Sequence, residues 1–313
     1  MAGARPESRS RRDAYAAITD RIIAALERGT VPWRAPWRAR GHRNALSGRP
    51  YRGINLLVLA ITALERGFDD PRWLTYRQAA SRGSHVRRGE HGTQVVLWKW
   101  IERGDSNTDE TDQRYPLLRL FTVFNVTQYE DLVLPTHDAA VPLDPLVEAE
   151  AIAAGYKDGP PVTCDAESAY YIPARDEVHL PPRESFRDAH GYYATLFHEL
   201  AHSTGHPSRL NRKGHQSAAR FGSEIYSREE LVAEFAAAFL GQEAGIDPSR
   251  VEQSAAYIAS WLMALRDDRR LVVVAAGQAQ RAADYILRRP EVDGGEPDEQ
   301  DTTDGARDDD RTE

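Results

Sequence analysis

The chain has 313 residues, 41% of them hydrophobic, and a formal net charge of −8 at pH 7. This length suggests about two domains, and the hydrophobic share is sufficient for a packed core. The single cysteine, Cys164, excludes an intrachain disulfide and fits a reducing compartment. The N-terminus lacks the apolar segment of a secretory signal, and the longest apolar run, residues 54–64, is about half the roughly 20 residues that cross a bilayer. We therefore expect a cytoplasmic protein with no membrane partner.

The charge is distributed unevenly along the chain. Residues 1–103 carry a net charge of +11, and residues 104–313 carry −19. A basic front half is typical of a protein that binds a polyanion such as nucleic acid, with a different role for the acidic rear half. The alternative is an arginine-rich surface that only reflects genome composition.

The front half reads as a small α+β domain over residues 13–132, preceded by a polar segment, 1–12, that we expect to be disordered. Helical spacing of apolar residues predicts three helices, and β-branched and aromatic residues predict two strands. These helices cover residues 13–28, 53–67 and 75–83, and the strands cover residues 93–100 and 116–126.

The rear half begins with a proline-rich linker over residues 133–160. Two short runs within residues 169–181 predict a β-hairpin, and the pattern is helical from about residue 190 onward. The fold class is therefore α+β, with a mainly helical second domain over residues 161–290. The acidic tail, residues 291–313, is predicted to be disordered, and it is interpreted as a solubilising tail, a DNA mimic or an autoinhibitor.

The segment LFHELAHSTGH contains the pattern H-E-x-x-H at His198, Glu199 and His202. On a helix, positions i and i+4 lie on one face, so that both imidazoles can reach one metal ion. Gly205 and Pro207 follow as helix-ending residues. The alternative is a polar helix face whose histidines are incidental.

A catalytic zinc needs a third protein ligand and an open position. Glu230, in the helical pattern SREELVAEFAAAFLG, is the preferred candidate, with Glu229 and Glu234 as fallbacks. Glu234, one turn beyond Glu230, is predicted to orient a ligating histidine as a supporting carboxylate. Another interpretation is that Ser227 and Glu230 form a capping box and that Glu230 only caps its helix.

A His/His/Glu site predicts metal-assisted hydrolysis of a peptide or amide bond. The metal is expected to be Zn²⁺, with Mn²⁺ or Co²⁺ as alternatives. Glu199, adjacent to a ligand, is predicted to act as the general base. His206 and Tyr226 are candidate donors to the developing oxyanion.

Single-strand binding without sequence preference needs cations along the backbone and aromatic faces for base stacking. The basic front half offers both kinds of residue, although Trp33 and Trp37 could equally anchor a loop onto the core. The candidate DNA-binding residues are Trp33, Arg34, Trp37, Arg38, Arg40, Arg43, Arg49, Tyr51, Arg52, Arg77, Arg87, Arg88 and Lys99.

Several segments together resemble the ArdC-type antirestriction proteins. The rear half is similar to their metallopeptidase domain in AYYIPARDEVHLPP, YYATLFHELAHSTGH and YSREELVAEFAAAFL, and the front half to their single-stranded-DNA-binding domain in PWRAPW, SGRPYRGINLLVL and WLTYRQAASRGSHVRRGEHGTQVVLWK. The resemblance covers roughly residues 13–288. It implies a zincin-like fold, metal ligands at His198, His202 and Glu230, a base at Glu199, and a mobile-element protein that protects incoming DNA from restriction during conjugation.

Three functions follow as hypotheses. The first is an antirestriction protein that binds single-stranded DNA, with duplex DNA as a further partner left open, and that cleaves an unknown protein substrate. The second is a DNA-masking protein whose metal site is structural. The third is a proteolytic toxin or effector directed to DNA by its front domain.

Overall fold

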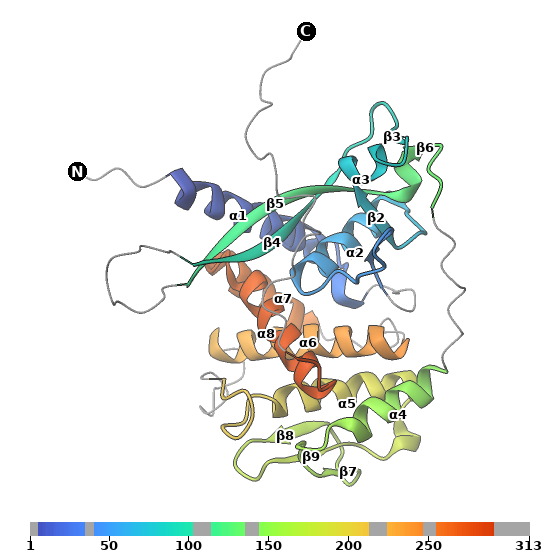
Figure 1. Ribbon diagram of the computed structural model, residues 1–313. Coiled ribbons are helices and arrows are strands. Elements are labelled where there is room, and N and C mark those ends of the chain that lie inside the picture. Colours follow the sequence, from blue (N-terminus) through green and yellow to red (C-terminus); the bar gives the residue numbers. More distant parts are fainter. Residues whose placement is uncertain are drawn as a thin grey trace, which may run out of the picture.

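The computed structural model describes residues 6–34, 41–102, 114–134, 144–212, 224–246 and 255–290 (Figure 1). It mixes helices with small sheets, which confirms the predicted α+β class. Within the described ranges, every helix is too short or too polar to span a bilayer. Residues 103–113 and the acidic tail, residues 291–313, lie outside these ranges.

The N-terminal part begins with helix α1 (Pro6–Glu27), so residues 6–12, which we expected to be disordered, are helical. The predicted second helix is α2 (Ile54–Arg66), and it ends at Gly67 in the left-handed conformation, with φ 68°. This conformation suits glycine, which has no Cβ to clash with the backbone. The predicted short helix is α3 (Tyr76–Ala80), which is capped by Thr75 and Gln78 in a capping box.

The main sheet of the N-terminal part has the strand order β1-β2-β5-β4. Its strands are β1 (Arg43–Asn44), β2 (Arg72–Thr75), β4 (Thr93–Glu102) and β5 (Arg114–Asn125), and β4 and β5 form the long antiparallel ribbon of Figure 1. Helix α2 is attached to this ribbon because the Asn55 side chain makes two 2.6 Å hydrogen bonds to the backbone of Val96. A second, two-stranded sheet pairs β3 (His85–Val86) with β6 (Tyr129–Glu130).

The C-terminal part begins with helix α4 (Pro145–Gly155), so this stretch of the predicted linker is helical, and its Ala149 belongs to the main core. Four further helices and a small sheet follow α4 along the chain. The predicted hairpin is β8 (Tyr170–Ile172) and β9 (Glu177–His179), and β7 (Val162–Thr163) extends it in the order β7-β9-β8. The helices are α5 (Ala189–Ser203), α6 (Glu224–Ala244), α7 (Ala255–Asp267) and α8 (Leu271–Ile286).

One continuous core joins the two halves of the chain. Buried side chains of the N-terminal helices, such as Ile22 and Leu57, belong to the same hydrophobic cluster as Phe197 on α5 and Val272 on α8. Close packing of this kind makes relative motion of the halves costly. The halves predicted as separate domains therefore share their packing.

Candidate metal site

Helix α5 places the H-E-x-x-H residues between a buried face and a polar face. Its N-terminus is capped by Asp188, whose side chain accepts a hydrogen bond from the Gly191 backbone. Phe197 and Ala201 are fully buried, whereas His198 and His202 are partly exposed, one turn apart on the other face. The amphipathic pattern therefore fixes which way the two imidazoles point.

Helix α6 brings Glu230 opposite these imidazoles. The helix begins at Glu224, so Ser227 lies inside it, and the Ser227 hydroxyl lies 2.6 Å from that of Ser260 on α7. The interpretation that Ser227 and Glu230 cap the helix is therefore wrong, because a cap residue must precede the first turn. Glu230 is instead 7% exposed, with its carboxylate facing α5.

Three candidate ligand side chains converge at this point. The two Nε2 atoms lie 3.1 Å apart, and the Glu230 carboxylate oxygens lie 3.4 Å from Nε2 of His202 and 3.5 Å from Nε2 of His198. Ligand atoms placed about 2.0–2.1 Å from a tetrahedral ion are about 3.3 Å from one another. The observed spacings and the two-imidazole, one-carboxylate donor set therefore fit a divalent metal ion, and this group is the one that could hold one among the described residues.

The electrostatics of the cluster agree with this geometry. Burial would raise the pKa of Glu230, but the two imidazoles outweigh it and hold that pKa well below its usual range. Burial would lower the pKa of His198, but the hydrogen bond and charge of Glu230, with the charges of Glu199 and Glu234, raise it to about 9. The surrounding carboxylates thus stabilise positive charge at the imidazoles, as a bound cation would require.

The two fallback acids lie elsewhere. Glu229 pairs with Arg212 at 3.1 Å, and the guanidinium of Arg212 also donates to the carbonyl of Ala201 and the hydroxyl of Thr204 at the end of α5. Glu234 lies on the far side of His198, with its Oε1 atom 3.6 Å from Nδ1. It occupies the place expected for a carboxylate that orients this ring, and that role stays a prediction.

Of the predicted catalytic residues, Glu199 is 7% exposed and close enough to His198 to influence its pKa. His206 does not belong to the three-residue metal-ligand group, and its Nδ1 atom lies 2.7 Å from the hydroxyl of Ser208. The side chain of Tyr226 lies outside the described residues. The roles predicted for Glu199, His206 and Tyr226 stay predictions.

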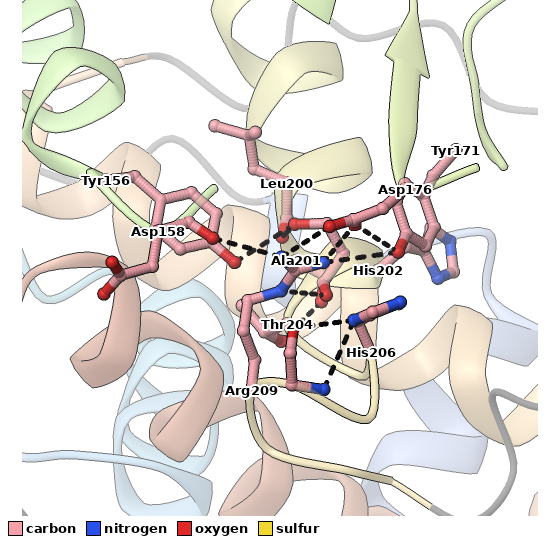
Figure 2. Close-up of polar contacts among 12 residues, drawn as sticks. Tyr156, Asp158, Tyr171, Asp176, Leu200, Ala201, His202, Thr204, His206 and Arg209 are labelled. Atoms are coloured by element: carbon pink, nitrogen blue, oxygen red, sulfur yellow. Dashed lines mark hydrogen bonds and ion pairs between the residues drawn. The ribbon is translucent and has the colours of Figure 1, made fainter. Parts of the chain in front are cut away.

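An ion pair with one buried partner lies at the end of α5 and was missed by sequence reasoning. Arg209, whose side chain is 3% exposed, pairs with Asp176 in the β8–β9 turn and donates to the Ser203 carbonyl at 2.8 Å (Figure 2). Burial would raise the pKa of Asp176, but Arg209 and Tyr171 outweigh it and lower that pKa. The pair ties the hairpin to the end of α5, and a contact across 33 residues leaves no local sequence signal.

Three of the candidate DNA-binding residues contact other side chains of the protein. Trp33 is 0% exposed, with its ring 4.7 Å from Phe235 and 5.2 Å from Trp261, so the predicted base stacking by Trp33 is wrong and the loop-anchor alternative is confirmed for this residue. Arg34 pairs with Glu234 at 2.7 Å. Arg52 pairs with Asp284 on α8.

The other candidates lie in or near the small sheets, or outside the described residues. Arg49, Arg77, Arg87 and Arg88 are exposed, and Arg43 and Tyr51 are half-buried. Sequence reasoning missed Tyr76, which is 54% exposed beside Arg77, because its exposure depends on how α3 sits on the sheet. Trp37, Arg38, Arg40 and the side chain of Lys99 lie outside the described residues.

Two protein families match consecutive parts of the chain. Residues 12–124 match the N-terminal domain of the anti-restriction factor ArdC, and residues 148–278 match the zincin-like metallopeptidase family. The second match contains the converging histidines and Glu230. A zincin-like domain implies a divalent metal, in agreement with the donor set.

Known proteins extend the likeness over most of the chain. The uncharacterized protein y4eC of Sinorhizobium fredii is 36% identical over 88% of this chain and 91% of its own length. The DNA primase TraC of Escherichia coli is 37% identical over 86% of this chain, which spans 26% of TraC.

Two crystal structures of the antirestriction protein ArdC from plasmid R388 also resemble the fold. The metal-free structure has a TM-score of 0.71 and 43% identity, and the Mn(II)-bound structure has a TM-score of 0.70 and 41% identity. Each likeness covers 88% of this chain and 97% of the other. The chain therefore belongs to the ArdC family of antirestriction proteins, with a zincin-like domain following the ArdC N-terminal domain.

Proposed function

We propose that this protein protects DNA of a mobile element from restriction, that it binds single-stranded DNA through its N-terminal half, and that it hydrolyses peptide bonds at the site on α5 and α6. The convergence of two imidazoles and one buried carboxylate within 3.1–3.5 Å of one another is the observation that supports the hydrolytic part. Zn²⁺ is the expected ion, and Mn²⁺ or Co²⁺ would fit the same donors.

His198, His202 and Glu230 would hold the ion, which when bound would supply Lewis acidity to a water molecule and to the substrate carbonyl. Glu199 follows His198 directly and is 7% exposed. In the proposed reaction it accepts the proton of the attacking water and passes it to the leaving amine. His206 and Tyr226 remain candidate donors to the oxyanion.

Metal binding can be tested separately from catalysis. We expect Zn²⁺ or Mn²⁺ to raise the melting temperature of the wild type, and EDTA to reverse the change, because an ion that binds the folded state stabilises it. Glu230→Gln and His202→Ala should abolish the shift. Glu243→Gln is the matched control, because Glu243 lies on the same helix but pairs with Arg289. A shift of wild-type size in Glu230→Gln would contradict the assignment of the third ligand.

Hydrolysis is tested with Glu199→Gln, which removes the proposed base and keeps the three ligands. We expect about 10²- to 10⁴-fold slower appearance of new N-termini in a host-cell lysate, measured by mass spectrometry, with metal binding unchanged. Protection of incoming DNA should be measured in the same variant. Full protection without hydrolysis would favour the DNA-masking hypothesis with a structural metal, and host-cell killing that Glu199→Gln abolishes would favour the toxin hypothesis.

The DNA-binding part is supported by exposed cations and an exposed aromatic ring in the N-terminal half of the chain. Arg77 adjoins Tyr76, and Arg49, Arg87 and Arg88 are also exposed. Loss of one stacked ring weakens binding by about 1–3 kcal/mol per base. We expect Tyr76→Ala to weaken binding of a fluorescent oligothymidine at least 5-fold, as measured by anisotropy. Tyr170→Ala is the matched control, because Tyr170 is 41% exposed in the other half of the chain; an equal effect of the two variants would contradict the proposal.

A further inference from the structure

Glu234 lies between His198 of the proposed metal site and the N-terminal residues Trp33 and Arg34. We infer that Trp33 and Arg34 are positioning residues for the metal site, because they hold the Glu234 carboxylate against the ring of His198. This inference rests on the metal site proposed above. It assigns these two residues, expected from the sequence to contact DNA, to the support of a metal ligand about 165 residues away.

A continuous series of contacts leads from Trp33 and Arg34 to His198. Arg34 donates to both Glu234 oxygens, from Nη2 to Oε1 at 2.7 Å and from Nε to Oε2 at 3.1 Å. The indole Nε1 of Trp33 donates to Oε2 at 3.2 Å. Oε1 lies 3.6 Å from Nδ1 of His198, the ring nitrogen that faces away from His202 and Glu230.

The surroundings hold this series of contacts rigidly in place. Trp33 is fully buried between Phe235 and Trp261, and the side chains of Arg34 and Glu234 are 16% and 11% exposed. A bidentate guanidinium fixes the plane of a carboxylate, and exclusion of water strengthens the attraction. The two donors thus hold Glu234 in one orientation, with Oε1 toward the imidazole.

The orientation matters because of the two nitrogens of the ring. A carboxylate opposite Nδ1 favours the tautomer that carries its proton there, which leaves a lone pair on Nε2. Nε2 is the atom of His198 that faces His202 and Glu230. Loss of Arg34 would free the Glu234 side chain to rotate toward water, and the ring would lose its preferred tautomer and position. The N-terminal half therefore contributes to the affinity for the metal without supplying a ligand.

A double-mutant cycle in the full chain tests the inference. Arg34→Ala, Glu234→Gln and the double variant are compared with the wild type for Zn²⁺ and Mn²⁺ affinity by chelator competition. We expect each single variant to bind about 10-fold more weakly, the lower end of the effect of removing such support. Because Arg34 acts through Glu234, the double variant should bind no more weakly than Glu234→Gln alone. Arg28→Ala is the matched control, because Arg28 pairs with Glu65 in the same half of the chain at 2.7 Å.

Two more conservative variants distinguish a role in positioning the metal ligand from a role in folding. Arg34→Lys keeps the charge without the bidentate contact, and Trp33→Phe keeps a large ring without the N–H donor. We expect both to keep the wild-type melting temperature in EDTA to within a few degrees, to bind Zn²⁺ more weakly than the wild type, and to shift the visible absorption of bound Co²⁺.

The outcomes are distinct. Wild-type affinity and an unchanged Co²⁺ spectrum in folded Arg34→Ala or Arg34→Lys would overturn this inference alone, as would additive losses in the cycle. A wild-type chain that binds none of the three ions would overturn the proposed metal site and the inference together.

Discussion

The change of stability with pH should depend on His42, which lies beside Trp73 in the N-terminal half of the chain. The indole of Trp73 donates a 3.0 Å hydrogen bond to Nδ1 of His42, so this nitrogen must carry a lone pair. Burial of the ring, helped by the nearby charge of Arg43, outweighs a hydrogen bond to the Pro71 backbone and lowers the pKa of His42 to about 4. Protonation of His42 would break the contact with Trp73 and charge a ring that is largely withdrawn from water.

The sign and size follow from the two pKa values. An unfolded chain protonates this histidine near pH 6.5 and the folded chain only near 4, so the unfolded chain binds more protons between these values. The neutral His42 ring therefore contributes to the free energy of unfolding in full above pH 6.5, and this contribution is lost as the pH falls toward 4. From pH 7.5 to pH 5 the loss is about 2 kcal/mol, and it approaches about 3 kcal/mol below pH 4.

Urea unfolding at pH 7.5 and pH 5, in EDTA, measures this loss. His42→Asn keeps an acceptor for the Trp73 indole without an ionising ring, so it should lose about 2 kcal/mol less than the wild type between the two pH values. His85→Asn, at an exposed position, should follow the wild type. Equal losses in the wild type and in His42→Asn would refute the reasoning.

Three further predictions concern packing and binding. Gly41→Ala should destabilise the fold by about 1–3 kcal/mol in urea unfolding, because the new Cβ would lie 1.9 Å from the Gln242 side chain at a residue with φ +51°. Arg209→Ala should cost about 1–3 kcal/mol in the same assay, because it removes a buried guanidinium that joins Asp176 to the end of α5. Arg77→Ala should reduce the slope of log affinity for single-stranded DNA against log salt by about 0.7 in anisotropy titrations, because one phosphate contact is lost.

Each of these has a matched control. Gly48→Ala shares a positive φ but has open space around it, so an equal loss there would contradict steric conflict as the cause in Gly41→Ala. Arg228→Ala removes an exposed pair with Asp268 and should cost less than about 1 kcal/mol. Arg175→Ala, at an exposed position in the C-terminal half, should leave the salt slope unchanged.

Local sequence patterns predicted many of the helices and strands. Helices α2, α3 and α5 and the β4–β5 and β8–β9 pairs lie where periodicity and residue type predict them. The start of α1 was predicted seven residues too late, because a polar arginine-rich sequence has no apolar spacing to reveal a helix. The core shared by the two halves was not predicted, because its contacts join α1 and α2 to α5, α6 and α8 across distant parts of the sequence.

Spacing along a helix is a local property, so the residue pattern alone was enough to place His198 and His202 on one face of a helix. The three-dimensional packing showed which of three neighbouring glutamates faces them, because that depends on how α6 lies against α5. It also decided that Trp33 is a core residue and that Arg34 reaches Glu234. An indole serves equally well in a core or under a base, so its residue type leaves the choice to contacts made across some 200 residues.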